Sequence, residues 1–160
     1  MTPRPVAVVD LDGVLADVDH RLHHLQGRPK NWAAFFAGMG DDPPYPEGFA
    51  LAGKLAEEHD IIYLSGRPER TRAVTQSWLA AHDAPTGRVM LRPDDDRRPA
   101  RLFKIGVLKR LSAHRKVAIL VDDDPAVCAA ARAAGFAVYE VEWSRPDQTL
   151  FAAQERDGRT

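Results

Sequence analysis

The stretch Val6-Ala7-Val8-Val9-Asp10-Leu11-Asp12-Gly13 joins a short apolar run to two closely spaced carboxylates. The run is rich in β-branched residues and has no polar position, which is typical of a strand buried on both faces of a parallel sheet. Ligands of such sheets bind beyond the carboxyl ends of the strands. The stretch therefore predicts an α/β fold and places a candidate site at the end of its first strand.

Four further stretches have the composition of strands, two of them strongly apolar and two weaker. In chain order they are residues 61–64, 88–91, 117–121 and 137–141. Helical patterns of apolar residues lie between the strands, over residues 48–59, 70–82, 102–111 and 125–134. Strands that alternate with helices predict a doubly wound parallel sheet with right-handed crossovers.

The length of 160 residues fits one domain. We expect a single α/β domain over residues 1–145 and a polar C-terminal tail over residues 146–160. Residues 17–46 are longer than an ordinary connection between a strand and a helix, and they contain several histidines and aromatic residues. We expect this segment to form a small helical cap insertion over the strand ends.

The composition excludes several classes of protein. Apolar residues make up 44% and charged residues 28%, as in soluble globular proteins. The single cysteine, Cys128, rules out a disulfide within the chain and a cysteine-rich zinc site. No apolar run approaches the roughly 18 residues of a membrane helix, and the first run is too short for a signal peptide. We therefore expect a cytoplasmic protein that does not contact a membrane.

The net charge of -1 hides a strongly basic middle third. Residues 67–116 hold 13 Lys and Arg against 5 Asp and Glu, and the rest of the chain is acidic. Such a stretch indicates an anionic partner, for example phosphate or nucleic acid, although solvated helix faces would give the same pattern.

Acidic residues follow two of the predicted strands. Asp10 and Asp12 come after the first strand, and Asp122 and Asp123 come after the strand at 117–121. Crowded carboxylates repel one another, so they favour a cation between them or a shared proton. Oxygen ligands of this kind suit Mg²⁺, which keeps part of its water shell and bridges to substrate phosphate. We therefore expect Mg²⁺ as the cofactor.

The strand at 61–64 runs into Ser65-Gly66-Arg67, a small hydroxyl and backbone donors close to a helix start. Phosphate oxygens bind well at such a position. Lys104, in the basic stretch, is the candidate cation for the same edge of the sheet.

Together these motifs resemble the four ordered motifs of the haloacid dehalogenase superfamily of phosphotransferases. The resemblance implies that Asp10 is the nucleophile that forms an aspartyl-phosphate, and that Asp12 is the general acid and base. Ser65 would hold a phosphoryl oxygen, and Lys104 would neutralise charge on the phosphoryl group and on Asp10. The implied Mg²⁺ ligands are Asp10, the backbone carbonyl of Asp12, Asp122 and Asp123.

A second set of residues is similar to the 3′-phosphatase domain of phage-type polynucleotide kinase-phosphatase. This resemblance implies a nucleic-acid 3′ end as the substrate. The matching positions, which we take as candidate substrate-binding residues, are Gly66, Arg67, Arg72, Arg92, Asp96 and Arg98.

We therefore expect a phosphatase that removes 3′-terminal phosphates from DNA or RNA, in functional partnership with a separate kinase or ligase. A nucleotidase or another small-molecule phosphatase of the same superfamily is the first alternative. The second alternative is a receiver-like signalling domain, in which an aspartyl-phosphate persists. An adjacent acid and base at Asp12 argues against such a domain, because it would not help a stable phospho-aspartate.

Overall fold

In the computed structural model, which describes residues 2–144 and 148–160, five parallel strands form the central sheet. Their order across the sheet is β3-β2-β1-β4-β5. The strands are β1 (Val6–Val9), β2 (Asp60–Pro68), β3 (Gly87–Arg92), β4 (Val117–Asp122) and β5 (Val138–Glu140). The predicted doubly wound α/β fold is confirmed.

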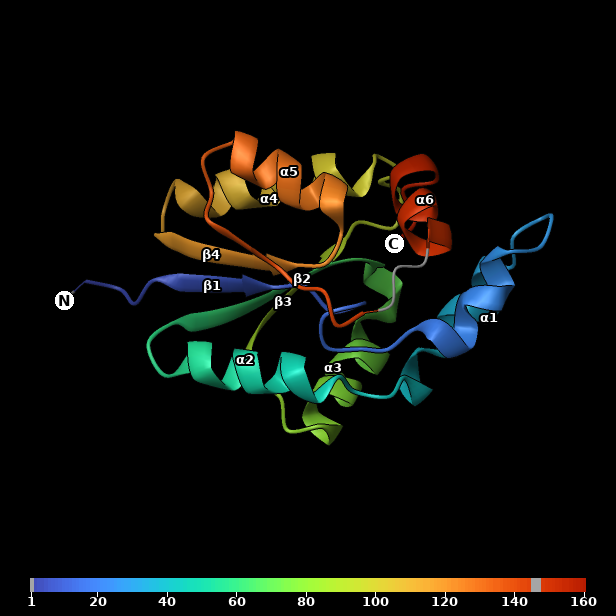
Figure 1. Cartoon of the computed structure of the whole chain (residues 1–160), viewed down its shortest axis with the longest axis horizontal. Coiled ribbons are helices and arrows are strands. Elements are labelled where there is room, and N and C mark those ends of the chain that lie inside the picture. The colour runs from blue at the N-terminus through green and yellow to red at the C-terminus, as the bar shows by residue number, and fades with distance from the viewer. Residues whose placement is uncertain (1, 145–147) are drawn as a thin grey trace.

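Two pairs of helices cover the two faces of the sheet (Figure 1). Helices α2 and α3 pack on one face, and helices α4 and α5 pack on the other. Their bounds are α2 (Pro46–Ala56), α3 (Arg72–Ala81), α4 (Ala100–Ser112) and α5 (Pro125–Ala133). Helix α5 begins as the sequence predicts, because the side chain of Asp124 accepts a hydrogen bond from the amide of Ala126 and Pro125 occupies the first turn.

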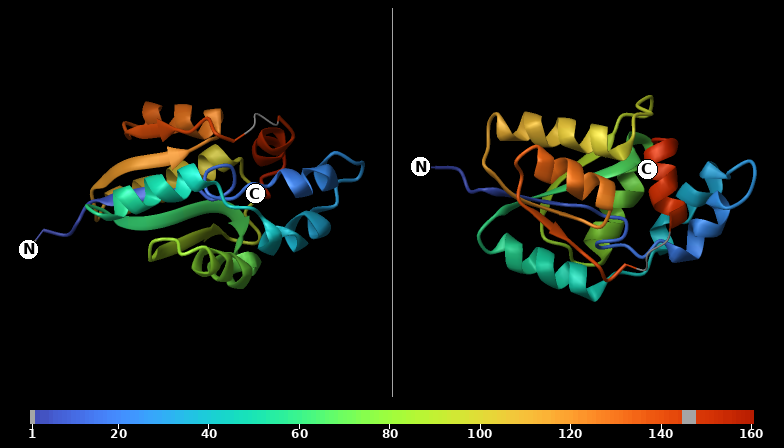
Figure 2. Two further views of the ribbon diagram at one scale, coloured as in Figure 1. Left: turned by 60° about the horizontal axis from the view of Figure 1, so that its bottom comes forward. Right: turned by 45° about the horizontal axis from the view of Figure 1, so that its top comes forward.

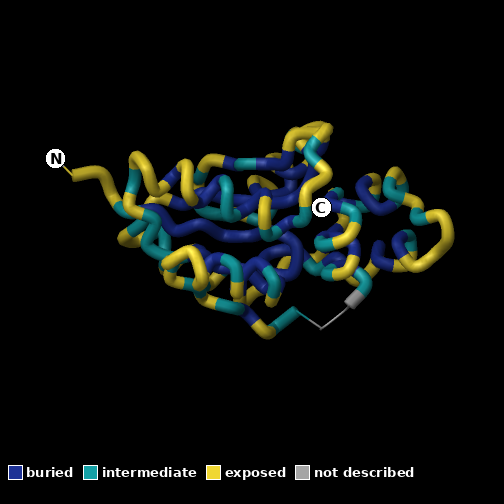
Figure 3. Tube along the Cα trace, turned by 90° about the horizontal axis from the view of Figure 1, so that it is seen from above, coloured by how far each residue is buried: buried dark blue, intermediate teal, exposed yellow. Residues whose placement is uncertain are grey.

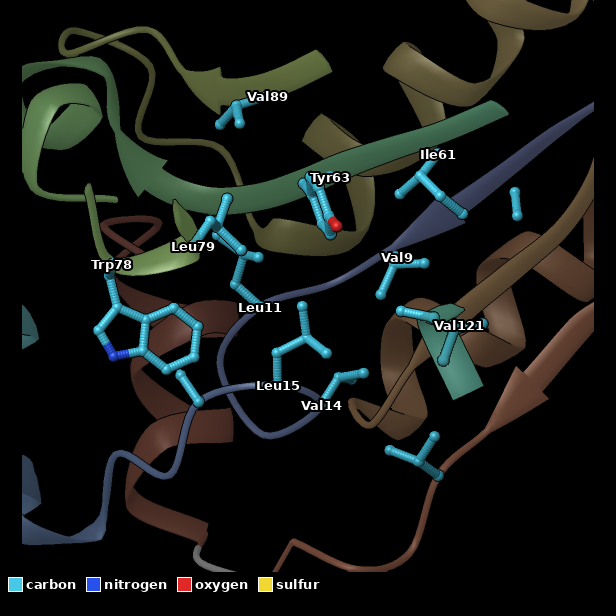
Figure 4. Close-up of a cluster of buried hydrophobic side chains, with 14 of the residues drawn as sticks. Val9, Leu11, Val14, Leu15, Ile61, Tyr63, Trp78, Leu79, Val89 and Val121 are labelled. Atoms are coloured by element: carbon cyan, nitrogen blue, oxygen red, sulfur yellow. The ribbon is translucent and has the colours of Figure 1, made fainter. Parts of the chain in front are cut away.

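The apolar first strand supplies two separate cores. Val9 belongs to the cluster under α2 and α3, which Figure 4 shows around Tyr63 and Trp78. Its neighbour Val8 belongs to the cluster under α4 and α5. Successive side chains of a strand point to opposite faces, so a strand covered on both sides must be apolar at every position. Strand β1 is accordingly buried over its whole length in the middle of the molecule (Figure 3).

The segment between β1 and α2 holds two 3₁₀-helices and one short α-helix. They span Asp19–Leu25, Trp32–Ala37 (α1) and Met39–Asp41. The side chain of Asn31 caps α1 by accepting a hydrogen bond from the amide of Ala34 over 3.0 Å. Phe35 is fully buried in a small apolar cluster of this segment.

The C-terminal residues contain a helix where the sequence predicts a polar tail. Helix α6 spans Gln148–Arg156 and buries Leu150 and Ala153 against Val18 and Leu22 of the cap segment. Figure 2 shows α6 and the cap segment side by side in both views. The expected polar tail thus contains a helix, because two apolar side chains on one face of it pack on an apolar partner surface. Residues 146 and 147 of the expected tail lie outside the described residues.

Within residues 2–144 and 148–160, the helices are too short or too polar to cross a lipid bilayer.

Candidate active site

Adjacent strands bring two carboxylates together at the carboxyl edge of the sheet. Val9 of β1 pairs with Val121 of β4, so the next residues, Asp10 and Asp122, emerge side by side. Lys104 of α4 reaches both of them: its Nζ lies 3.0 Å from Oδ1 of Asp10 and 2.7 Å from Oδ2 of Asp122. All three side chains are buried. Burial alone would lower the pKa of Lys104, but Asp10 and Asp122 outweigh it and raise the pKa.

The acidic cluster fits a divalent cation. Asp10, Asp122 and Asp123 each offer one carboxylate oxygen, and these oxygens lie within 4.8 Å of one another. Oδ2 of Asp10 and Oδ1 of Asp123 are buried without a hydrogen-bond partner among the described residues. Burial and the neighbouring Asp122 raise the pKa of Asp10 to about 8. Burial and Asp10 likewise raise the pKa of Asp123. A bound cation would offset the burial and the mutual repulsion of these carboxylates. A set of oxygen ligands of this kind is what Mg²⁺ prefers.

The turn after Asp12 depends on a glycine. Gly13 has φ +84°, and a Cβ atom at this position would lie 1.9 Å from Oδ2 of Asp123. A side chain here would therefore push Asp123 out of the cluster. The contribution of the Asp12 backbone carbonyl to a metal site stays a prediction.

The side chain of Asp12 contacts two arginines rather than the other carboxylates. Oδ1 of Asp12 accepts hydrogen bonds from Nε of Arg67 at 3.0 Å and from Nη2 of Arg67 at 2.5 Å. Nη2 of Arg21 lies 3.4 Å from the same oxygen. Burial alone would raise the pKa of Asp12, but Arg67 and Arg21 outweigh it and hold the pKa below its ordinary value. Asp12 is therefore a carboxylate at neutral pH.

Asp42 holds the two arginines in place. Its Oδ1 and Oδ2 each accept a hydrogen bond from Arg21 at 2.8 Å, and Oδ2 lies 3.3 Å from Nη2 of Arg67. Its backbone carbonyl accepts a hydrogen bond from the Trp78 indole at 2.9 Å. No sequence pattern marks Arg21 or Asp42 as a site residue. The Asp41-Asp42-Pro43-Pro44 segment has the composition of a turn, and only the burial of one of its carboxylates distinguishes it.

Ser65 and Gly66 continue the site on β2. Ser65 is buried, and its Oγ accepts a hydrogen bond from the amide of Arg67 over 3.1 Å. The carbonyl of Gly66 accepts a hydrogen bond from Nε of Arg92 over 3.1 Å. Gly66 allows a close approach of the chain: a Cβ atom at this position would lie 2.3 Å from the backbone carbonyl carbon of Thr160.

The remaining arginines predicted to bind substrate differ in burial and in their distance from the carboxylates. Arg92 is fully buried, donates to the carbonyl of Arg98 over 2.7 Å, and has its pKa lowered to about 10, mainly by burial. Arg98 is exposed and forms a 2.8 Å ion pair with Asp96, which lowers the pKa of Asp96. The structure does not bring Arg72 to the carboxylates.

Arg72 lies instead on the far side of the edge strand β3. Its guanidinium donates to the carbonyl of Val89 over 3.0 Å and pairs with Glu69. Both contacts hold the side chain against the strand rather than toward Asp10.

Thr160 also belongs to the site, although no sequence pattern indicates this. Its hydroxyl donates to Oδ2 of Asp12 over 3.5 Å, and its carbonyl accepts from Nη2 of Arg92 over 3.4 Å. Thr160 is only 2% exposed. The segment that ends at Thr160 therefore occupies space between Asp12 and the buried Arg92.

Comparison with known proteins links this geometry to a phosphatase family. The family model described as the polynucleotide kinase PNKP phosphatase domain matches residues 4–145. A search of the curated proteins found no match.

Solved structures share the fold at low sequence identity. A chain of the Pnkp1/Rnl/Hen1 RNA repair complex has a TM-score of 0.72 and 22% identity, over 89% of this chain and 44% of that chain. This protein thus spans less than half the length of that chain. A haloacid dehalogenase-like hydrolase from Streptococcus pneumoniae has a TM-score of 0.67 and 14% identity, over 98% and 93% of the two chains. A HAD-family enzyme from Bacteroides thetaiotaomicron, in complex with magnesium and inorganic phosphate, has a TM-score of 0.51 and 13% identity, over 92% and 99%.

Proposed function

Because the chain belongs to the family of polynucleotide kinase PNKP phosphatase domains, we propose that it is a Mg²⁺-dependent phosphomonoesterase that removes 3′-terminal phosphates from DNA or RNA. The observation that carries the proposal is the buried pair of Asp10 and Lys104, which are 3.0 Å apart beside two further carboxylates. Asp12, two residues after Asp10, supplies the separate acid and base that turnover requires.

The reaction divides between two carboxylates. Oδ2 of Asp10 has no hydrogen-bond partner among the described residues, so it is free to attack phosphorus. The attack forms an aspartyl-phosphate and breaks the bond to the sugar oxygen. Asp12, a carboxylate in the free protein, takes up a proton from solvent before this step and passes it to the sugar oxygen. Water then attacks phosphorus, gives its proton to Asp12, and releases phosphate and free Asp10. The arginines beside Asp12 stabilise the carboxylate form that accepts this proton.

The remaining polar groups position the phosphoryl group. Lys104 would neutralise charge on Asp10 and on the phosphoryl oxygens, and the Ser65 hydroxyl would hold one of these oxygens. Asp10, Asp122 and Asp123 would hold Mg²⁺. When bound, Mg²⁺ would neutralise charge on the phosphoryl oxygens and on the crowded carboxylates.

The choice of a nucleic-acid end is supported by arginines near the site. Arg98 is exposed beside the buried Arg92, and a guanidinium pairs well with a backbone phosphate. Gly66, Arg67 and Asp96 shape this region through the contacts described above. The fold shared with a chain of an RNA repair complex supports a role in end repair, in partnership with a separate kinase or ligase.

Phosphate release from matched substrates tests the proposal. The substrates are an oligonucleotide with a 3′-phosphate, the same oligonucleotide with a 5′-phosphate, and a mononucleotide 3′-phosphate, each with and without Mg²⁺. Asp10→Asn is the blank. We expect Mg²⁺-dependent release that favours the 3′-phosphorylated oligonucleotide. Equal or faster release from the mononucleotide would reject the polymer substrate and favour a nucleotidase.

A further inference from the structure

A cavity lies at the amino ends of strands β2 and β3, away from the carboxylates. It has a volume of about 760 Å³ and lies between the first residues of β2 and β3 and the last turn of α4. We call it the basal cavity. Its walls include Ile62, Met90, Leu111 and Pro85, which give it an apolar surface.

The basal cavity carries an excess of positive charge. Asp60 is the one acidic residue among its described lining residues, and it is already paired with Arg115 at 2.7 Å and with Arg4 at 3.9 Å. Arg88 and Arg110 also line the cavity, are exposed, and have no ion pair within residues 2–144 and 148–160. Two arginines without a partner beside an apolar wall suit a ligand that combines anionic and flat apolar parts.

A nucleic-acid strand has this combination of groups. Its phosphates pair with arginine, and its bases bury their faces against apolar surface. Binding of nucleic acid here would give a role to part of the basic middle third of the sequence. Several arginines of that stretch lie away from the carboxylates and line this cavity.

The basal cavity lies close enough to the active site to receive the same strand. Ile62 lines the cavity, and Ser65 lies three residues further along β2, a distance of about 10 Å at about 3.3 Å per residue. Arg88, Met90 and Arg92 alternate along β3 and therefore project on the same face of that strand. Helix α4 covers the part of this face that holds Met90 and Arg92, whereas the outer edge of β3 has no neighbouring strand within the described residues, so the substrate would run along that edge.

We propose that the basal cavity binds the nucleic-acid substrate about three nucleotides and more from its reacting end, at about 3.4 Å per stacked nucleotide. Arg88 and Arg110 pair with phosphates, and the apolar walls contact the bases. The inference rests on the proposed function, since it adds a second binding site for the same substrate.

Kinetics with substrates of two lengths test the inference. The double variant Arg88→Ala/Arg110→Ala removes the two unpaired charges. The control Lys54→Ala/Arg132→Ala removes two exposed charges that do not line the cavity. We expect the first variant to raise KM for a 3′-phosphorylated oligonucleotide of about twelve nucleotides by about five-fold or more, and to leave KM for a 3′-phosphorylated dinucleotide unchanged. The control should change neither value by more than about two-fold.

A binding measurement separates this inference from the proposed function. Fluorescence anisotropy with a labelled oligonucleotide without a 3′-phosphate reports affinity in the absence of turnover. Weaker binding by the Arg88→Ala/Arg110→Ala variant than by the control supports the basal site, and equal binding overturns it. An equal rise in KM for the long and the short substrate overturns it as well. If the wild type hydrolyses no 3′-phosphorylated oligonucleotide, the proposed function fails, and the anisotropy result still decides whether the cavity binds nucleic acid.

Discussion

The hydroxyl of Thr160 donates a hydrogen bond to Asp12 over 3.5 Å, although 148 positions separate the two residues. The contact places the last described segment of the chain in the active site. Lys30 of the cap pairs with Asp157, and Arg159 lies 5.7 Å from the ring of Trp32. Contacts with the cap therefore hold the segment beside Asp12.

Deleting residues 157–160 should make the site more accessible. Thr160 contacts Asp12 and Arg92 and so occupies space beside the carboxylate that follows Asp10 by two residues, where a phosphomonoester on Asp10 would need room. We expect KM for a phosphomonoester to fall several-fold in the deletion variant, because no binding energy is then spent on displacing the segment. Steady-state kinetics check this expectation, with Arg156→Ala as the control. A KM that is unchanged or higher would show that the segment does not obstruct the substrate.

Replacing Asp42 with Asn should destabilise the protein. Asp42 is buried between Arg21 and Arg67, and its loss leaves two buried guanidinium groups with too little compensating charge. Breaking a buried ion pair on one side typically costs about 3–5 kcal/mol. Urea denaturation measures the loss in the free energy of unfolding. The exposed neighbour Asp41→Asn is the matched control, and a similar small effect of both variants would contradict the role of Asp42.

Asp10→Asn should abolish phosphate release without unfolding the protein. Asn keeps the shape of the side chain but cannot act as the nucleophile, so we expect a loss of about 10³-fold or more. Burial raises the pKa of Asp10 to about 8, so without metal the neutral Asn replaces a largely protonated group at pH 7, and Lys104 keeps its 2.7 Å pair with Asp122. The melting temperature should therefore not fall. Thermal denaturation and phosphate release measure the two effects, with the exposed Asp95→Asn as the control. Residual activity near that of the wild type would assign the nucleophile to another group.

Mg²⁺ should stabilise the folded protein even without substrate. It would bind Asp10, Asp122 and Asp123 in the folded state and offset the burial and repulsion that raise the pKa values of Asp10 and Asp123. At a Mg²⁺ concentration of about 100 times its Kd, the free energy of unfolding should rise by about 2.7 kcal/mol. A rise in melting temperature that EDTA reverses, and that Asp123→Asn reduces, supports the metal site. The same rise in Asp123→Asn as in the wild type would place the cation elsewhere.

The sequence alone predicted the strands, most of the helices and the edge of the sheet where the carboxylates meet. The reason is local: strands buried on both faces must be apolar at every position, as Val8 and Val9 are, so their ends are visible in the sequence. Parallel strands all have their carboxyl ends at one edge of the sheet, which predicts that Asp10 and Asp122 lie near each other, as the pairing of Val9 with Val121 confirms. These features depend on the pattern of apolar residues along each segment and not on how distant segments pack together.

Only the tertiary structure showed how Asp12 is held and what covers it. Asp42 is a buried ion-pair partner only because the cap folds onto α3, and the sequence of the turn gives no sign of this. Arg72 and Arg92 belong to the same basic stretch, yet one is held on the outside of the edge strand and the other is buried at the site. Thr160 reaches Asp12 because α6 packs on the cap. These contacts join distant segments through surface complementarity, which has no local pattern in the sequence.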